Sequence, residues 1–260
     1  MKRILTAALM IPLVAYAVLW ADYWVFFAVL ALSAVLSYRE YDTIAASYGF
    51  GAPGATGYAA GLLLLLWDKT PWPAWFLLVL LAGFALTMGL RLIDLSHALP
   101  RAALLLLGVV YIFGCWKCAI PIREDFHSRH WLMYALLLNW VGDIGAYYIG
   151  KPFGKHKLAP VVSPKKTWEG SIASVAASLL MAGGYLWYFV PGVNPLHILV
   201  LTVAANVAGQ CGDLAESALK RGAGVKDSGG ILPGHGGFLD RVDSTLFALP
   251  VVYGYLLIVR

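Results

Sequence analysis

The chain has 260 residues, of which 60% are hydrophobic and only 13% are Asp, Glu, Lys or Arg, and its mean hydropathy is +0.74. A soluble domain usually carries about a quarter of its residues as charged side chains, so this composition excludes a protein whose whole surface faces water. The formal net charge of +5 comes from Lys and Arg clustered between apolar runs. In a membrane protein such clusters indicate orientation and anionic ligands, and we expect no nucleic-acid partner.

Long apolar runs predict membrane-spanning helices. A segment in lipid must satisfy its backbone hydrogen bonds internally, as a helix or as part of a closed barrel. The apolar runs are continuous rather than alternating, which favours helices. We therefore predict an all-α, polytopic integral membrane protein with about nine transmembrane helices. The expected spans are residues 4–20, 22–38, 54–67, 72–93, 101–120, 130–149, 171–190, 195–217 and 244–259.

The sequence shows no clear internal repeat and no low-complexity linker, so we expect one integral membrane domain over residues 1–260. Within it, residues 1–100 supply the N-terminal helices. Residues 101–260 supply the helices and loops that carry the candidate catalytic residues.

The first span has an alternative interpretation as a cleavable signal peptide. Lys2-Arg3 precedes an apolar stretch that ends in Ala15-Tyr16-Ala17, which is the pattern of such a peptide. A retained helix is favoured, because apolar character continues with little break into the next run.

Orientation follows from the Lys and Arg residues between spans, which favour the cytoplasmic side. Fourteen of them fall on the side of the N-terminus: Lys2, Arg3, Arg39, Arg91, Arg101, Lys151, Lys155, Lys157, Lys165, Lys166, Lys220, Arg221, Lys226 and Arg241. Four fall on the other side: Lys69, Arg123, Arg129 and Arg260. We predict an inner cell-membrane protein whose N-terminus and basic loops 150–170 and 218–243 are cytoplasmic.

Lys117 lies inside the expected span 101–120. A lone cation in lipid is costly, so we expect its ammonium group to face a protein interior or cavity. The alternative is that the long side chain reaches the nearer membrane surface.

Carboxylates inside apolar spans usually mark a functional site. In the span 130–149, Asp143 shares a helix face with Asn139 and Tyr147. In the span 195–217, a polar stripe runs toward the following loop, and it contains Asn206, Gln210, Asp213, Ser217 and Lys220. Glu216 follows Asp213 by one turn. Polar contacts between helices are the alternative, but two neighbouring carboxylates at membrane depth favour a bound cation.

The loop 218–243 combines three features of a phosphate site. Its glycines, among them Gly236 and Gly237, let backbone amides approach an anion closely. Four cations can hold phosphates: Lys220, Arg221, Lys226 and Arg241. Asp227, Asp240 and Asp243 are oxygen donors suited to Mg²⁺, and His235 is a candidate hydrogen-bond partner of a phosphate. The combination predicts phosphoryl or nucleotidyl transfer.

The loop 150–170 contains five lysines, including Lys165 and Lys166. By itself it is as typical of an ordinary cytoplasmic loop that binds acidic lipid as it is of a substrate-binding site. Beside the loop 218–243 it becomes a second wall of an anion site. The sequence contains neither a P-loop nor a His-Glu-x-x-His zinc motif. The loop 218–243 has one His and several carboxylates, which favours oxygen coordination of a hard cation over zinc.

Several of these segments together resemble the CDP-diacylglycerol synthase family. The resemblance rests on Gly142-Asp143-x-Gly145-Ala146-Tyr147, on residues 163–170, and on the motif Ser217-x-Leu219-Lys220-Arg221-x4-Lys226-Asp227-x-Gly229-x2-Leu232-Pro233-x-His235-Gly236-Gly237-Phe238-x-Asp240-Arg241-Val242-Asp243. It covers the C-terminal half, whereas residues 1–100 match only as apolar helices.

The resemblance implies a Mg²⁺-dependent enzyme, with a two-cation site possible, that condenses CTP with phosphatidic acid and works as a homodimer among membrane lipids. Its expected metal ligands are Asp213, Glu216, Asp240, Asp243, Asp143 and Asp227. Its expected catalytic residues are Asp213, Asp240, Asp243, Lys220 and Arg221. Its expected substrate-binding residues are Lys165, Lys166, Ser217, Lys226, His235, Gly236, Gly237 and Arg241.

Two alternatives stay open at this point. A CDP-alcohol phosphotransferase, or another membrane lipid phosphotransferase, also uses aspartates at the membrane surface, but its Asp-Gly-x2-Ala-Arg pattern is missing. A transporter or channel would explain buried carboxylates and Lys117, but not the glycine-rich loop.

The charge asymmetry predicts that cysteines introduced at positions 155 and 226 are labelled from the same face of the membrane. In sealed vesicles, an impermeant maleimide should modify both from the cytoplasmic face, and should modify a cysteine at position 129 only from the other face. Labelling of positions 155 and 226 from the face opposite to the cytoplasm would overturn the topology.

Overall fold

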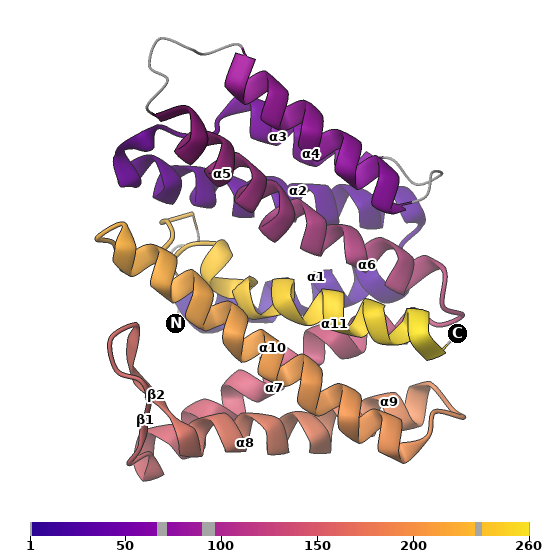
Figure 1. Cartoon of the computed structure of the whole chain (residues 1–260). Coiled ribbons are helices and arrows are strands. Elements are labelled where there is room, and N and C mark those ends of the chain that lie inside the picture. Colours follow the sequence, from indigo (N-terminus) through magenta and orange to yellow (C-terminus); the bar gives the residue numbers. More distant parts are fainter. Residues whose placement is uncertain (1, 67–71, 90–96, 232–235, 260) are drawn as a thin grey trace. The chain divides into compact units, whose positions relative to one another are not determined.

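The computed structural model describes residues 2–66, 72–89, 97–231 and 236–259 (Figure 1). It is built almost entirely of helices, which confirms the predicted all-α class. The first six helices are α1 (Lys2–Leu19), α2 (Tyr23–Ala45), α3 (Ala55–Leu66), α4 (Trp72–Gly89), α5 (Ala98–Gly108) and α6 (Cys115–Glu124). The others are α7 (His130–Phe153), α8 (Trp168–Ser178), α9 (Gly184–Phe189), α10 (Pro195–Gly222) and α11 (Asp243–Val259).

Wider π-helical turns join or extend several helices. They are η1 (Ala46–Phe50) after α2, η3 (Val109–Gly114) between α5 and α6, and η4 (Leu179–Gly183) between α8 and α9. A short 3₁₀ turn, η5 (Leu239–Arg241), precedes α11.

Four helical runs within the described residues are long and apolar enough to cross a membrane. They are Tyr23–Phe50, Ala98–Glu124, Trp168–Phe189 and Pro195–Gly222. This is the pattern of a membrane protein, as predicted from composition, whereas the count of nine transmembrane helices stays a prediction. Two helices end later than expected, α7 at Phe153 rather than 149 and α10 at Gly222 rather than 217. Helical hydrogen bonding continues past the last apolar residue, so α10 carries its polar stripe in unbroken helix.

The loop 150–170 contains a β-hairpin that the sequence analysis did not predict. Strand β1 (Lys157–Ala159) pairs antiparallel with β2 (Ser163–Thr167), and Lys157 lies opposite Thr167. Thr167 then caps α8, since its hydroxyl accepts a hydrogen bond from the backbone N–H of Gly170 at 3.2 Å. The hairpin therefore holds this basic segment against the start of a helix.

The chain folds as two compact units, each assembled from segments that are distant in sequence. Unit 1 comprises Met1–Phe26, Cys118–Ala218 and Val242–Arg260, and unit 2 comprises Phe27–Lys117 and Leu219–Arg241. The single integral domain expected for residues 1–260 stays a prediction.

The core of unit 2 is aromatic. Tyr38, Tyr41 and Phe113 are fully or almost fully buried, and the rings of Tyr38 and Phe113 lie 5.2 Å apart. Gly61 makes room for Phe113, because a Cβ atom at residue 61 would lie 2.0 Å from the ring. Close helix packing around an aromatic side chain thus depends on this glycine.

Lys117 faces the interior of unit 2, as predicted. Its side chain is only 2% exposed. The ammonium group donates a hydrogen bond to the backbone oxygen of Leu65, near the end of α3, at 3.2 Å. A carbonyl at a helix C-terminus is a favourable partner for a cation.

Replacing Gly61 with Ala should lower the free energy of unfolding by about 1–3 kcal/mol, the usual cost of overpacking a core. The matched control is Gly184→Ala, also in a helix, where the added methyl group meets nothing within 4 Å. That control should leave stability unchanged or slightly raised. Thermal unfolding in detergent would measure both variants, and equal melting temperatures would contradict the packing argument.

Candidate functional site

Unit 1 contains a pocket of about 720 Å³ that is lined by several charged and amide side chains. Its walls come from α7, the β-hairpin, α8 and α10, and α11 contributes Ser244 at its first turn. Pockets of this volume suit drug-sized or nucleotide-sized ligands.

The pocket has a positive wall. Lys165 and Lys166 line it from β2, Lys157 lines it from β1, and Lys151 lines it from the last turn of α7. The pocket therefore contains the two lysines that were predicted to bind substrate. The sequence analysis counted Lys151 and Lys157 among the loop cations, but did not choose them as site residues.

Two carboxylates face these lysines in the same pocket, Asp143 from α7 and Asp213 from α10. Lys166 Nζ lies 2.5 Å from Asp213 Oδ2, so the two side chains form an ion pair. Ser217 Oγ donates a hydrogen bond to the other oxygen, Asp213 Oδ1, at 3.4 Å. Asp213 and Lys166, predicted on different segments, are thus direct neighbours.

Buried and half-buried amides and hydroxyls link α10 to α8 beside the pocket. Gln210 Nε2 donates to Asn206 Oδ1 at 2.7 Å, and Asn206 Nδ2 donates to Ser174 and Ser178 at 3.0 and 2.9 Å. Ser171 Oγ in turn donates to Gln210 Oε1 at 2.5 Å. These contacts hold Gln210 in one orientation toward the pocket.

The sequence analysis found the α10 half of this network but missed its serines on α8. Ser171, Ser174 and Ser178 recur at three and four residues, which places them on one helix face. That spacing, in an otherwise apolar helix, could have predicted a polar contact with another helix.

Further carboxylates of unit 1 gather near the start of α11. Asp243 is 7% exposed and Glu216 is fully buried. Asp213, Glu216 and Asp143 all lie close enough to Asp243 to repel its negative charge, and among these three Asp213 repels it most strongly. Asp243 Oδ1 also accepts a hydrogen bond from the N–H of Ser244 at 2.7 Å. Four of the six predicted metal ligands therefore belong to one region.

The chemistry of this region fits a hard cation such as Mg²⁺. Like charges at low exposure are unfavourable unless a cation or donors compensate them. Among the described residues, no three or more His, Cys, Asp or Glu side chains are arranged to hold a metal ion by themselves. Mg²⁺ usually binds through one or two carboxylates and completes its shell with water and substrate phosphates, so a partial protein ligand set is consistent with it.

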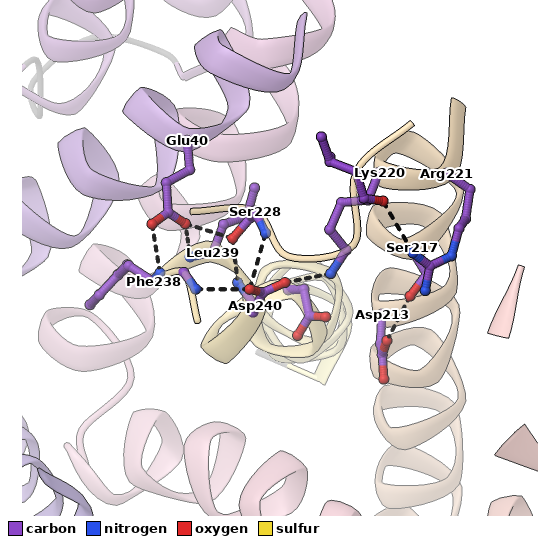
Figure 2. Close-up of polar contacts among 12 residues, drawn as sticks. Glu40, Asp213, Ser217, Lys220, Arg221, Ser228, Phe238, Leu239 and Asp240 are labelled. Atoms are coloured by element: carbon purple, nitrogen blue, oxygen red, sulfur yellow. Dashed lines mark hydrogen bonds and ion pairs between the residues drawn. The ribbon is translucent and has the colours of Figure 1, made fainter. Parts of the chain in front are cut away.

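The remaining predicted residues that the structure describes belong to unit 2, in the last turn of α10 and in the segment after it, where Asp240 is surrounded by donors (Figure 2). Lys220 Nζ forms an ion pair with Asp240 Oδ1. The other oxygen, Oδ2, accepts hydrogen bonds from the N–H groups of Gly237 at 2.9 Å and Ser228 at 3.1 Å. Burial by itself raises the pKa of Asp240, but the hydrogen bonds from Lys220 and Gly237 outweigh it and hold the pKa below its ordinary value.

The glycine-rich loop does bring backbone amides to an anion, but the anions seen here are carboxylates of the chain itself. The N–H of Gly237 donates to Asp240, and those of Phe238 and Leu239 donate to Glu40 at 2.9 and 2.8 Å (Figure 2). The sequence analysis missed Glu40, which follows an expected span by two residues. Its position so close to an apolar run could have indicated that this carboxylate is buried and needs a partner.

The other loop residues are more accessible. Lys226, Asp227 and Arg241 are exposed, and Arg221 Nη1 donates to the backbone oxygen of Val225 at 3.1 Å. His235 lies outside the described residues. Asp213 belongs to unit 1 and Asp240 to unit 2, so their predicted sharing of a metal site stays a prediction.

Comparison with known proteins identifies related sequences. Residues 1–259 match the cytidylyltransferase family. Over 151 residues, 58% of the chain, it is 44% identical to the phosphatidate cytidylyltransferase of Staphylococcus haemolyticus (strain JCSC1435), and this stretch is 57% of that protein. Over 163 residues, 62% of the chain, it is 40% identical to the phosphatidate cytidylyltransferase of Bacillus subtilis (strain 168), and this is 61% of that protein. The chain thus covers less than two thirds of these relatives.

The lowered pKa of Asp240 makes a prediction about pH. A carboxyl group with a depressed folded-state pKa stabilises the fold above its unfolded pKa, and this contribution is lost as the pH falls through the folded pKa. Wild type should exceed Asp240→Asn by about 2 kcal/mol in unfolding free energy at pH 7, the scale of hydrogen bonds to a charged group. The difference should shrink as the pH falls below about 4, the ordinary pKa of Asp. Denaturant unfolding at stepped pH measures it, and a pH-independent difference would contradict the ion pair.

Proposed function

The chain belongs to the cytidylyltransferase family, and from this premise we propose that it transfers the cytidylyl group of CTP to phosphatidic acid. The products would be CDP-diacylglycerol and pyrophosphate, as a step of phospholipid biosynthesis. Two findings support the proposal: relatives that are 40–44% identical are named phosphatidate cytidylyltransferases, and the pocket of unit 1 combines four lysines with two carboxylates. The pocket is the single structural observation that carries it, because it offers the charges that a nucleotide and a lipid phosphate require.

The reaction needs no general base. A phosphate oxygen of phosphatidic acid is already anionic, and it attacks the α-phosphorus of CTP. A new oxygen–phosphorus bond forms while the bond between the α-phosphorus and its bridging oxygen to the β-phosphorus breaks. Pyrophosphate leaves with that electron pair. The main barrier is the approach of two anions, which fixed cations lower by electrostatic stabilisation.

The pocket lysines meet this requirement. We propose that Lys165 and Lys166 bind phosphates from β2, and that Lys151 and Lys157 complete the positive wall. Ammonium groups are strong point-charge donors to phosphate. The hairpin presents the lysines of β1 and β2 on a hydrogen-bonded frame, so their positions depend less on side-chain freedom than in an irregular loop.

Magnesium, when bound, would neutralise phosphate charge and favour the departure of pyrophosphate. Asp143 and Asp213 in the pocket are the residues proposed to hold it, with Asp243 and Glu216 close by. Without substrate, Asp213 is paired with Lys166. We propose that Lys166 turns to a substrate phosphate when substrates bind, which frees Asp213 oxygens for the cation. Asp227 and Asp240 of unit 2 stay proposed ligands on the strength of the motif.

The proposal includes a setting for the reaction. Fourteen of the Lys and Arg residues fall on one predicted side of the membrane and four on the other, which supports a cytoplasmic N-terminus and cytoplasmic basic loops. CTP would then reach the pocket from the cytoplasm and phosphatidic acid from the inner membrane. Nine spans and a homodimer complete the proposed arrangement.

The test is CDP-diacylglycerol formation by purified protein supplied with labelled CTP, phosphatidic acid and Mg²⁺. Lys165→Met and Lys166→Met should each lower kcat/KM about tenfold to a hundredfold, on the scale of losing one charge-assisted contact. Lys155→Met is the matched control. This exposed lysine lies in the same loop but does not line the pocket, so its variant should keep near-normal turnover.

Two results would contradict the proposal. Absence of product with wild type, under conditions where a known phosphatidate cytidylyltransferase works in parallel, would remove the function. Equal losses of kcat/KM for all three lysine variants would contradict the proposed site. The activity would stand, but general positive charge rather than this pocket would account for substrate binding.

A further inference from the structure

Glu40 connects the second helix of unit 2 to the glycine-rich loop. It lies near the end of α2 and is only 3% exposed. Its Oε1 accepts a hydrogen bond from the N–H of Phe238 at 2.9 Å, and its Oε2 accepts from the N–H of Leu239 at 2.8 Å. Oε2 also accepts from the hydroxyl of Ser228 at 2.7 Å (Figure 2). One carboxylate thus binds Ser228 and the two adjacent residues Phe238 and Leu239.

Burial of the Glu40 carboxylate carries a cost in lost solvation. A carboxylate taken out of water must recover its lost solvation from donors. Glu40 recovers it from the loop itself, and these donors lie 188 to 199 residues further along the chain. Two of the donors are backbone N–H groups of the adjacent residues Phe238 and Leu239, so the backbone there is held in place together with the carboxylate.

The loop glycines show that space for Glu40 is built into the loop. A Cβ atom at Gly229 would lie 2.5 Å from Glu40 Oε1, and its three nearest atoms would all belong to Glu40. A Cβ atom at Gly237 would lie 1.9 Å from Ser228 Oγ and 2.4 Å from Glu40 Oε2, so Glu40 and its partner Ser228 together fill that space. In contrast, a Cβ atom at the neighbouring Gly230 would meet nothing within 4 Å. The close approach of Glu40 therefore excludes a side chain at specific positions.

Ser228 extends the connection from Glu40 to the ion pair of the loop. Its hydroxyl donates to Glu40 and accepts from the N–H of Asp240 at 3.3 Å. Its own N–H donates to Asp240 Oδ2 at 3.1 Å. Asp240 in turn pairs with Lys220. Displacing Glu40 should consequently shift Asp240 and Lys220, which the motif marks as catalytic.

We propose that Glu40 is a positioning residue of the enzyme, which holds Ser228, Phe238 and Leu239 in place so that Lys220 and Asp240 keep their working geometry. Glu40 itself contacts no substrate in this proposal. The inference rests on the proposed function for its activity measurements, but the loop geometry can be tested without turnover.

The first test compares Glu40→Gln with Asp42→Asn. The Gln side chain turns one acceptor into a donor that faces the N–H or O–H groups of the loop. Asp42 lies on the same helix and accepts a hydrogen bond from the N–H of Gly54 at 2.8 Å, so Asp42→Asn controls for loss of a carboxylate on α2. Glu40→Gln should lower kcat about tenfold or more, with KM for CTP changed less than about threefold. Asp42→Asn should keep kcat within about threefold of wild type.

A pair of neighbouring glycines provides the second test, which does not alter Glu40. Gly229→Ala should displace Glu40 and lower kcat by a similar factor, while Gly230→Ala should not. In the background of Glu40→Ala, adding Gly229→Ala should cause little further loss, because the atoms that it would meet are gone. Such non-additivity is the mark of two residues acting through one contact.

Hydrogen exchange measured by mass spectrometry tests the geometry in the full-length protein without substrate. Glu40→Gln and Gly229→Ala should speed exchange in peptides covering residues 236–241 at least about tenfold, and leave peptides from α7 unchanged. Unchanged exchange in residues 236–241, or a kcat for Glu40→Gln equal to wild type, would overturn the inference. Faster exchange together with wild-type protein that forms no CDP-diacylglycerol would support the loop geometry and reject the proposed function instead.

Discussion

The placement of carboxylates in a largely apolar chain is the constraint on which both candidate regions depend. A carboxylate removed from water needs hydrogen-bond donors or a cation in return. In unit 2 the return comes from the protein, since Glu40 and Asp240 each accept from backbone N–H groups of the same loop. In unit 1 it comes partly from Lys166, which pairs with Asp213.

This difference indicates that the carboxylates of the two units have different roles. Glu40 and Asp240 are surrounded by donors of the chain and so stabilise the shape of the loop. Asp143 and Asp213 instead line a pocket beside lysines, and in the proposed function a substrate phosphate and its cation exchange partners with them. An ion pair at a pocket wall is well suited to this exchange, because a phosphate can replace the carboxylate beside the lysine and a cation can replace the lysine beside the carboxylate.

The polar network between α8 and α10 has a supporting part. Asn206 and Gln210 are tied to serines of α8 by hydrogen bonds of 2.5 to 3.2 Å. Polar contacts between apolar helices fix their rotation relative to one another more strictly than apolar packing does. The orientation of Asp213, one turn beyond Gln210 on α10, follows from that rotation.

Much of this protein was determined by its sequence. Continuous apolar runs predicted the all-α membrane class, because a backbone in lipid must bond internally and helices do so locally. Asp143, Asp213, Lys165 and Lys166 were also predicted, since charges beside or within apolar segments are conspicuous, and the structure finds them in one pocket. The motif in the loop 217–243 pointed to the family to which the chain belongs.

Only the tertiary structure decided what the loop amides bind and which residues complete the pocket. The partners of Glu40 lie almost two hundred residues away in the sequence, and no local pattern reports such a distance. The hairpin of β1 and β2 was hidden because its strands, of three and five residues, are too short for a periodic signal. Local hydrogen bonding and hydrophobicity are written along the chain, whereas the pairing of distant donors and acceptors exists only after folding has brought them together.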